Sequence, residues 1–93
     1  MRKVFVLNVD RNYINYNFVK VFDNKEILVN FVLNYLFEMM VENEYLNIED
    51  KEDFVKENKE KYGEDIMKIN NVIFGEEDIW FGIEEVEINN MEF

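Results

Sequence analysis

The residues of this sequence that could do chemistry are nearly all carboxylates, and three of them have a spacing that could create a site. Asp50, Asp53 and Glu57 follow one another at intervals of three and four residues, which places them on one face of a helix. Such a set could hold Mg²⁺ or Ca²⁺, and paired carboxylates can act as a general acid and base. Acid-rich helices also show this spacing by chance, and nearby lysines, Lys56 among them, offer the same carboxylates an ion pair.

A second candidate metal site lies near the N-terminus and fails on its spacing. Asn8, Asp10 and Asn12 alternate as the first ligands of a calcium-binding loop do. Tyr13, however, stands where that loop requires Gly, and Val19 stands where it requires Glu. This stretch is therefore not expected to bind calcium.

The residue types that are missing from the chain exclude most other chemistry. It contains no His, Cys, Ser, Thr, Gln, Ala or Pro. The usual general base near neutral pH, the imidazole metal ligand, the zinc site with sulfur ligands and the usual acyl-transfer nucleophiles are all absent. We therefore expect a protein that is not an enzyme and that binds no metal or cofactor.

The net charge of −11 arises entirely in the second part of the chain. Residues 1–40 have a net charge of +1, whereas residues 41–93 carry five basic and 17 acidic residues, a net charge of −12. The excess gathers on an expected helix, at an expected hairpin tip and on the last expected strand. The predicted partner-binding residues are Glu49, Asp50, Glu52, Asp53, Glu57 and Glu60; Glu76, Glu77 and Asp78; and Glu84, Glu85 and Glu87.

Clustered carboxylates can steer and bind a basic partner. Proteins meet the phosphates of nucleic acid with Lys and Arg, so a folded surface with closely spaced carboxylates could occupy the same basic groove. The alternative is that the charge only keeps a small, Phe-rich domain in solution. Direct binding of nucleic acid is not expected, because the chain has no basic patch.

The chain is organised around a long helix expected over residues 23–43. Its central part has only three polar residues, Asn30, Asn34 and Glu38, and they recur at every fourth position. The remaining apolar arc is wider than that of an ordinary surface helix. The run is shorter than the roughly 20 residues that a membrane span needs, so no membrane contact is expected.

The wide apolar arc of this helix requires cover on two sides. We expect a sheet against one flank, and a second helix or a second subunit against the flank that contains Val29, Leu33 and Phe37. Asp23 is the expected N-cap, and Glu26 stands at the spacing of a capping box.

Strand patterns lie on both sides of this helix. The expected strands cover residues 3–9, 13–22, 66–74 and 79–88, and a second helix is expected over residues 50–62. The order ββααββ predicts a single α+β domain over residues 1–93, with two layers: a four-stranded, mostly antiparallel sheet and two helices on one of its faces. The apolar alternation of the last strand changes phase at Glu84 and Glu85, which predicts a β-bulge there.

Two stretches of the chain carry a resemblance. The first reads KVFVLNVD…NYNFVKVFDNKEILVNFV, and the second, in the last strand, reads FGIEEVEI. Together they resemble small bacteriophage proteins of the ββα type, whose last strand often reads like YIEEVEL. The sequence departs from that pattern at Lys20, where those proteins usually have Gly, and at Leu28 and Val29, which replace a more Ala-rich helix start. The resemblance covers about half the chain and implies a fold and a phage setting. In size, charge and composition the chain is also similar to small acidic anti-CRISPR and other anti-defence proteins.

Two main hypotheses for the function follow, and a carboxylate-metal enzyme that uses Asp50, Asp53 and Glu57 is a third. In the first, the protein is a phage-type inhibitor in the host cytoplasm that binds a basic, nucleic-acid-handling defence protein, such as a CRISPR effector, through a surface that mimics nucleic acid. In the second, it is a structural or accessory phage protein that forms a homodimer through the apolar face of its long helix. No signal peptide is expected, because Asn8 and Asp10 interrupt the first apolar run.

Overall fold

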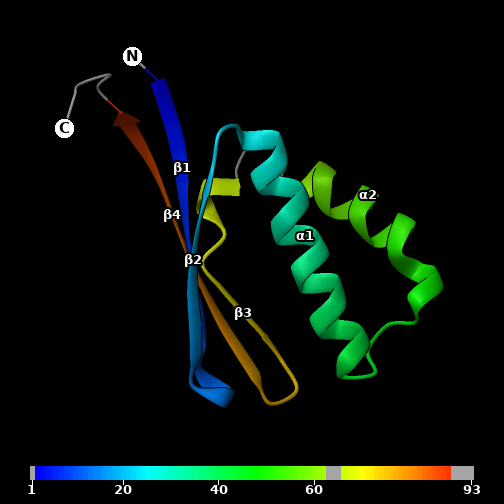
Figure 1. Cartoon of the computed structure of the whole chain (residues 1–93). Helices are drawn as coiled ribbons and strands as arrows, with labels where there is room; N and C mark the ends of the chain where they lie inside the picture. The colour runs from blue at the N-terminus through cyan, green and yellow to red at the C-terminus, as the bar shows by residue number, and fades with distance from the viewer. Residues whose placement is uncertain (1, 63–65, 89–93) are drawn as a thin grey trace.

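The computed structural model describes residues 2–62 and 66–88, and it confirms the predicted α+β class and element order (Figure 1). In chain order the strands and α-helices are β1 (Arg2–Arg11), β2 (Tyr16–Phe22), α1 (Lys25–Glu42), α2 (Lys51–Tyr62), β3 (Asn71–Phe74) and β4 (Glu77–Ile88). Short 3-10 helices at Asn12–Ile14, Ile48–Asp50 and Ile66–Lys68 precede β2, α2 and β3. The predicted second and third strands therefore begin later than expected, since local turns occupy their first residues.

The four strands form one antiparallel sheet in the order β2-β1-β4-β3. The first and last strands of the chain, β1 and β4, lie at its centre and pair from Arg2 opposite Ile88 to Arg11 opposite Ile79. Each hairpin then adds one edge strand, β2 beside β1 and β3 beside β4. The sheet is therefore held together by a pairing between the two ends of the chain.

The predicted β-bulge at Glu84 and Glu85 is wrong, because the register of β1 and β4 continues through both residues without a slip. The apolar residues of β4 change phase because they change face. Phe81 points toward α1, where its ring meets that of Tyr35, whereas Val86 lies on the opposite face of the sheet. The change of phase in the sequence of β4 therefore reflects a change in which face of the strand is covered, and not an interruption of its pairing with β1.

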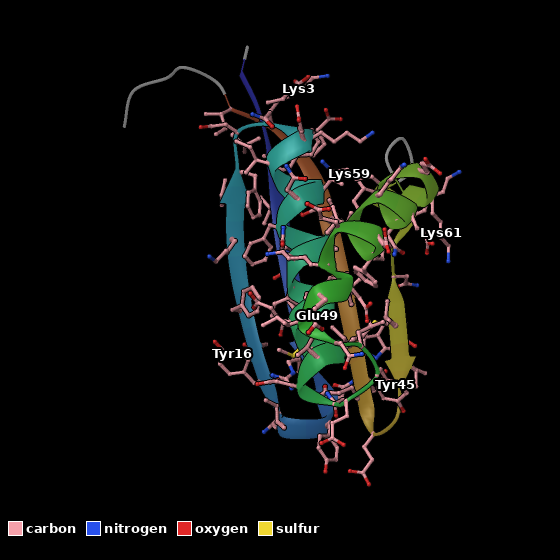
Figure 2. All side chains as sticks on the ribbon, turned by 90° about the vertical axis from the view of Figure 1, so that its right-hand side faces the viewer. Lys3, Tyr16, Tyr45, Glu49, Lys59 and Lys61 are labelled. Atoms are coloured by element: carbon pink, nitrogen blue, oxygen red, sulfur yellow. The ribbon has the colours of Figure 1, made fainter. Side chains whose placement is uncertain are left out.

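Helix α1 lies between the sheet and α2, as two perpendicular views show (Figures 1 and 2). Its N-cap is Asn24, whose side chain accepts a hydrogen bond of 2.9 Å from the backbone N–H of Ile27. The prediction of Asp23 as the cap is therefore wrong by one residue. The core of the domain forms around α1, and its fully buried members are Leu7, Leu28, Leu33, Ile66, Ile79, Val9 and Val32.

The wide apolar arc of α1 is covered as predicted, by the sheet on one side and by α2 on the other. Val29, Leu33 and Phe37 are all buried, and the Phe37 ring lies 5.7 Å from that of Phe54 of α2. The predicted two-layer packing is not confirmed, because α1 stands between α2 and the sheet. The apolar flank of α1 is thus used inside the chain and is not available to a second copy.

Candidate functional site

The acidic residues at the tip of the second hairpin are bound by the turn of the first hairpin. Glu77 begins β4 and is only 3% exposed, and Arg11 ends β1 beside it. Arg11 donates from Nη2 to one carboxylate oxygen of Glu77 and from Nε to the other, the second bond measuring 3.3 Å. This forked bond raises the pKa of the Arg11 guanidinium. Glu77 was predicted to bind a partner, but the structure places its carboxylate in a buried position where it is already paired with Arg11.

The two neighbours of Glu77 also have partners within the chain. The Asp78 carboxylate accepts hydrogen bonds from the side-chain amides of Asn71, at 2.6 Å, and Asn12, at 3.3 Å. These bonds, that from Asn71 first, lower the pKa of Asp78. A hydrogen bond to Glu76 raises the pKa of the Tyr13 phenol. Three consecutive residues of the first turn thus contact three consecutive acidic residues of the second, which indicates a structural role for this cluster.

The loop after α1 lies against the same hairpin tip. Gly75 has a φ of +58°, and a Cβ atom placed on it would lie 2.8 Å from the hydroxyl oxygen of Tyr45. Figure 2 shows Tyr45 beside the end of β3. Glycine is favoured at position 75 both by its left-handed backbone and by the close approach of this ring.

One buried polar atom near the Arg11–Glu77 pair lacks a well-formed hydrogen bond. Within the described part of the chain the Tyr35 hydroxyl makes no hydrogen bond of normal geometry, although the Arg11 guanidinium lies close enough to act on it by charge and as a donor. Burial raises the pKa of Tyr35, and Arg11 partly offsets that rise. The sequence gives no sign of this cluster, because Arg11 and Glu77 are 66 residues apart.

Helix α2 presents the largest group of exposed carboxylates. Asp50, at its start, is the exception, since its side chain accepts the backbone N–H of Asn47 at 2.9 Å and closes a capping box. The other members of the predicted set are exposed and make no ion pair within the described ranges: Glu49, Glu52, Asp53, Glu57 and Glu60. Four lysines alternate with them, so residues 49–62 have a net charge of only −2.

The acidic residues of β4 lie in a third place and face two ways. Glu84 is opposite Val6, on the face of the sheet away from α1, while Glu85 and Glu87 are on the other face. Glu85 forms an exposed ion pair with Lys3 at 3.8 Å. Six residues of strand, or about 20 Å, separate Glu84 from Asp78. The structure therefore divides the twelve predicted residues among separate regions, and it does not bring them onto one acidic surface.

A groove between α1 and α2 was not predicted. It has a volume of about 480 Å³ and is lined by Asn34, Lys51, Glu52, Val55, Lys56 and Lys59. Figure 2 shows Lys59 on the side of α2 that borders α1. The groove is apolar at its base and lysine-lined at its rim, a pattern that arises when Lys side chains cover an apolar helix contact.

The sequence analysis also missed an apolar surface along β2. Phe18 and Phe22 of this edge strand pack against Phe31 of α1 with ring centroids 6.2 Å and 5.3 Å apart, yet all three rings are only half-buried. Val19 and Val21, on the other face of the same strand, are exposed. We call this surface the β2 flank; it comprises Tyr16, Phe18, Val19, Val21, Phe22, Ile27 and Phe31. Its sequence signal was a strand with apolar residues on both faces, which is typical of a covered strand and not of an edge.

Neither the metal-site search, the search for membrane spans nor the comparison with known proteins assigns a function to the chain. Across residues 2–62 and 66–88, no group of three or more acidic side chains is arranged to hold a metal ion, and neither the length nor the apolar character of any helix fits a membrane span. The resemblance to small phage proteins stays a prediction from sequence, because no protein-family model, curated protein or solved structure matches the chain.

Proposed function

We propose that this protein is a non-catalytic inhibitor that binds a basic, nucleic-acid-handling protein through the exposed carboxylates of α2. One observation carries the proposal: four exposed carboxylates without an ion pair among the described residues lie along α2, the element farthest from the sheet, and a fifth, Glu49, lies on the 3-10 helix just before it. Neighbours on one helix face are about 5–6 Å apart, and the helix is about 18 Å long. Such a row can enter a groove that otherwise holds a run of phosphates.

Contacts within the chain exclude some of the twelve predicted residues from the proposed binding surface. Glu77 is buried against Arg11, and Asp78 and Glu76 are bound by the first hairpin turn, so the hairpin tip is set aside. The interleaved lysines of α2 make it unlike a uniform polyanion, so the partner would have to match their positions also. From the resemblance described above we also propose a phage setting. The partner would then be a host defence protein, such as a CRISPR effector.

The test is charge reversal on α2. Glu52, Asp53 and Glu57 are replaced together by Lys, and the matched control reverses Glu84, Glu85 and Glu87, which changes the net charge equally at a distant place. Binding to a partner captured from host lysate is then measured in competition with that partner's own nucleic acid.

The α2 variant should lose binding while the β4 variant keeps it. Wild-type binding should weaken as salt rises, because exposed charge pairs are screened beyond about 8–10 Å at physiological ionic strength. Simultaneous binding of protein and nucleic acid, or full binding by the α2 variant, would exclude mimicry by this helix.

A further inference from the structure

We propose that two copies of this chain associate through the β2 flank, with β2 of one copy pairing antiparallel to β2 of the other across a two-fold axis. This interface would join two four-stranded sheets into one continuous sheet. It uses neither the acidic helix α2 nor the buried flank of α1, so it is independent of the inhibitor function proposed above.

The backbone of β2 is open to such a pairing. β2 pairs with β1 alone, so the backbone groups on its other side have no strand partner among the described residues. Edge strands are normally protected by shortness, by proline, by a bulge or by charge. β2 has seven residues, and its only charged residue is Lys20. The Lys20 Nζ lies 4.7 Å from the ring centroid of Phe31, toward α1, and not across the free edge.

The other edge of the sheet differs in these respects. β3 has four residues, and it lies next to the start of β4, where Glu77 and Asp78 are bound. A short strand offers few backbone groups to a partner. This contrast favours β2 over β3 as the site of association.

Side chains on both sides of β2 would be covered by the same contact. Val19 and Val21 are 60% and 61% exposed on the outer face of the sheet. On the α1 side, Tyr16 and Ile27 are about half exposed and border the half-buried phenylalanine rings. Aromatic and apolar side chains at the centre of a contact supply most of its binding energy.

The distribution of charge favours a second copy as the occupant of the β2 flank. Two chains of net charge −11 repel each other, and every acidic cluster described above lies after residue 41. The β2 flank carries no carboxylate, so it lets two copies approach without bringing their acidic clusters together. An acidic partner would find one positive charge on β2, that of Lys20, which lies over the Phe31 ring, whereas an apolar edge related by a two-fold axis is complementary to itself.

The first experiment measures the mass of the protein in solution by sedimentation equilibrium over a range of concentrations. The wild type should approach twice its monomer mass of 11.4 kDa. The double variant Val19→Glu/Val21→Glu should raise the dissociation constant about 100-fold or more, because it places like charges against each other. The matched control is Ile73→Glu, at a 67% exposed position on the other edge strand, which should leave the constant unchanged.

The effect of salt distinguishes self-association through the β2 flank from partner binding through α2. Raising the salt concentration should strengthen self-association, because it screens the repulsion between two negative chains, whereas binding of a basic partner to α2 should weaken. Failure of one proposal therefore does not decide the other.

The second experiment uses the absence of cysteine from the chain. Single Cys substitutions at positions 17, 18, 19, 20 and 21 are oxidised, with Ile73→Cys as the control. Antiparallel pairing across a two-fold axis places one residue opposite its own copy with Cα atoms about 4.5–5.5 Å apart, within the range of a disulfide. One position should therefore cross-link much faster than the control. The proposal would be overturned if the wild type is monomeric at millimolar concentration, or if no position in the strand cross-links. It would also be overturned if the β2 edge pairs only with a different protein and not with its own copy.

Discussion

Replacing Glu77 by Leu while Arg11 stays in place should lower the free energy of unfolding by about 3–5 kcal/mol, because it leaves a largely buried charge without its partner. The Arg11 side chain is 13% exposed and that of Glu77 is 4% exposed, so water can replace little of the lost interaction. A chain of 93 residues has a total stability of roughly 5–14 kcal/mol. This single change should therefore remove a large part of it.

The double variant Arg11→Met/Glu77→Leu should recover most of the loss. An apolar pair of similar size avoids the desolvation of two charges, and such replacements are often neutral or stabilising. The pair Lys3–Glu85 is the control, since its side chains are 55% and 46% exposed and it should contribute less than about 1 kcal/mol.

Urea unfolding followed by the fluorescence of Trp80, the only tryptophan, measures all of these variants. Trp80 lies on β4, three residues from Glu77, so the signal reports on the hairpin tip as well as on the whole domain. If Glu77→Leu costs no more than Glu85→Leu, or if the double variant is as unstable as the singles, the account of this buried pair is wrong.

Three further outcomes follow from the packing. Phe37→Ala should cost about 3–5 kcal/mol in urea unfolding, and it should cost much less in a Phe54→Ala background, because the two rings cover each other. Gly75→Ala should lower the melting temperature for two reasons, the contact with the Tyr45 ring and the positive φ. Adding Tyr45→Ala to this variant removes the ring, so it should recover only the loss of melting temperature that the contact causes. Tyr35→Phe should leave stability unchanged or raise it by about 1 kcal/mol, since it removes a buried hydroxyl without a well-formed hydrogen bond; a clear loss of stability would show that the hydroxyl is bonded in solution.

Much of the fold could be predicted from the sequence because its elements have strong local signals. The polar stripe of Asn30, Asn34 and Glu38 defines α1, and the width of the remaining arc correctly required a second cover opposite the sheet. The wrong predictions of local structure concern single positions at which two neighbouring residues are equally suitable. Asn24 and Asp23 are both good N-caps, and only the backbone shows which side chain reaches the first-turn amide.

The site was harder to predict, because charge in a sequence does not say where a carboxylate points. Glu76, Glu77 and Asp78 look like an exposed acidic tip, yet the pairing of β1 with β4 brings Arg11 and Asn12 onto them from 66 residues away. Glu84 and Glu85 are neighbours in sequence and lie on opposite faces of the sheet. Each outcome depends on long-range pairing, which residue composition does not encode.

The central position of β1 and β4 has a consequence for how the chain acquires its structure during synthesis. β1 is synthesised well before its main partner, β4, and at about 5–20 residues per second the segment between them takes several seconds to make. Until then, β1 and β2 form only an isolated hairpin, which is marginally stable, and α1 has no complete sheet to pack on. The sheet should therefore be completed only after β4 has been made, and folding should be slow for a domain of this size, because contacts between distant segments close late. A chain shortened before β4 would leave β1 as a second open edge, and so nascent and truncated chains, rather than the finished protein, are the species most exposed to aggregation and to proteases.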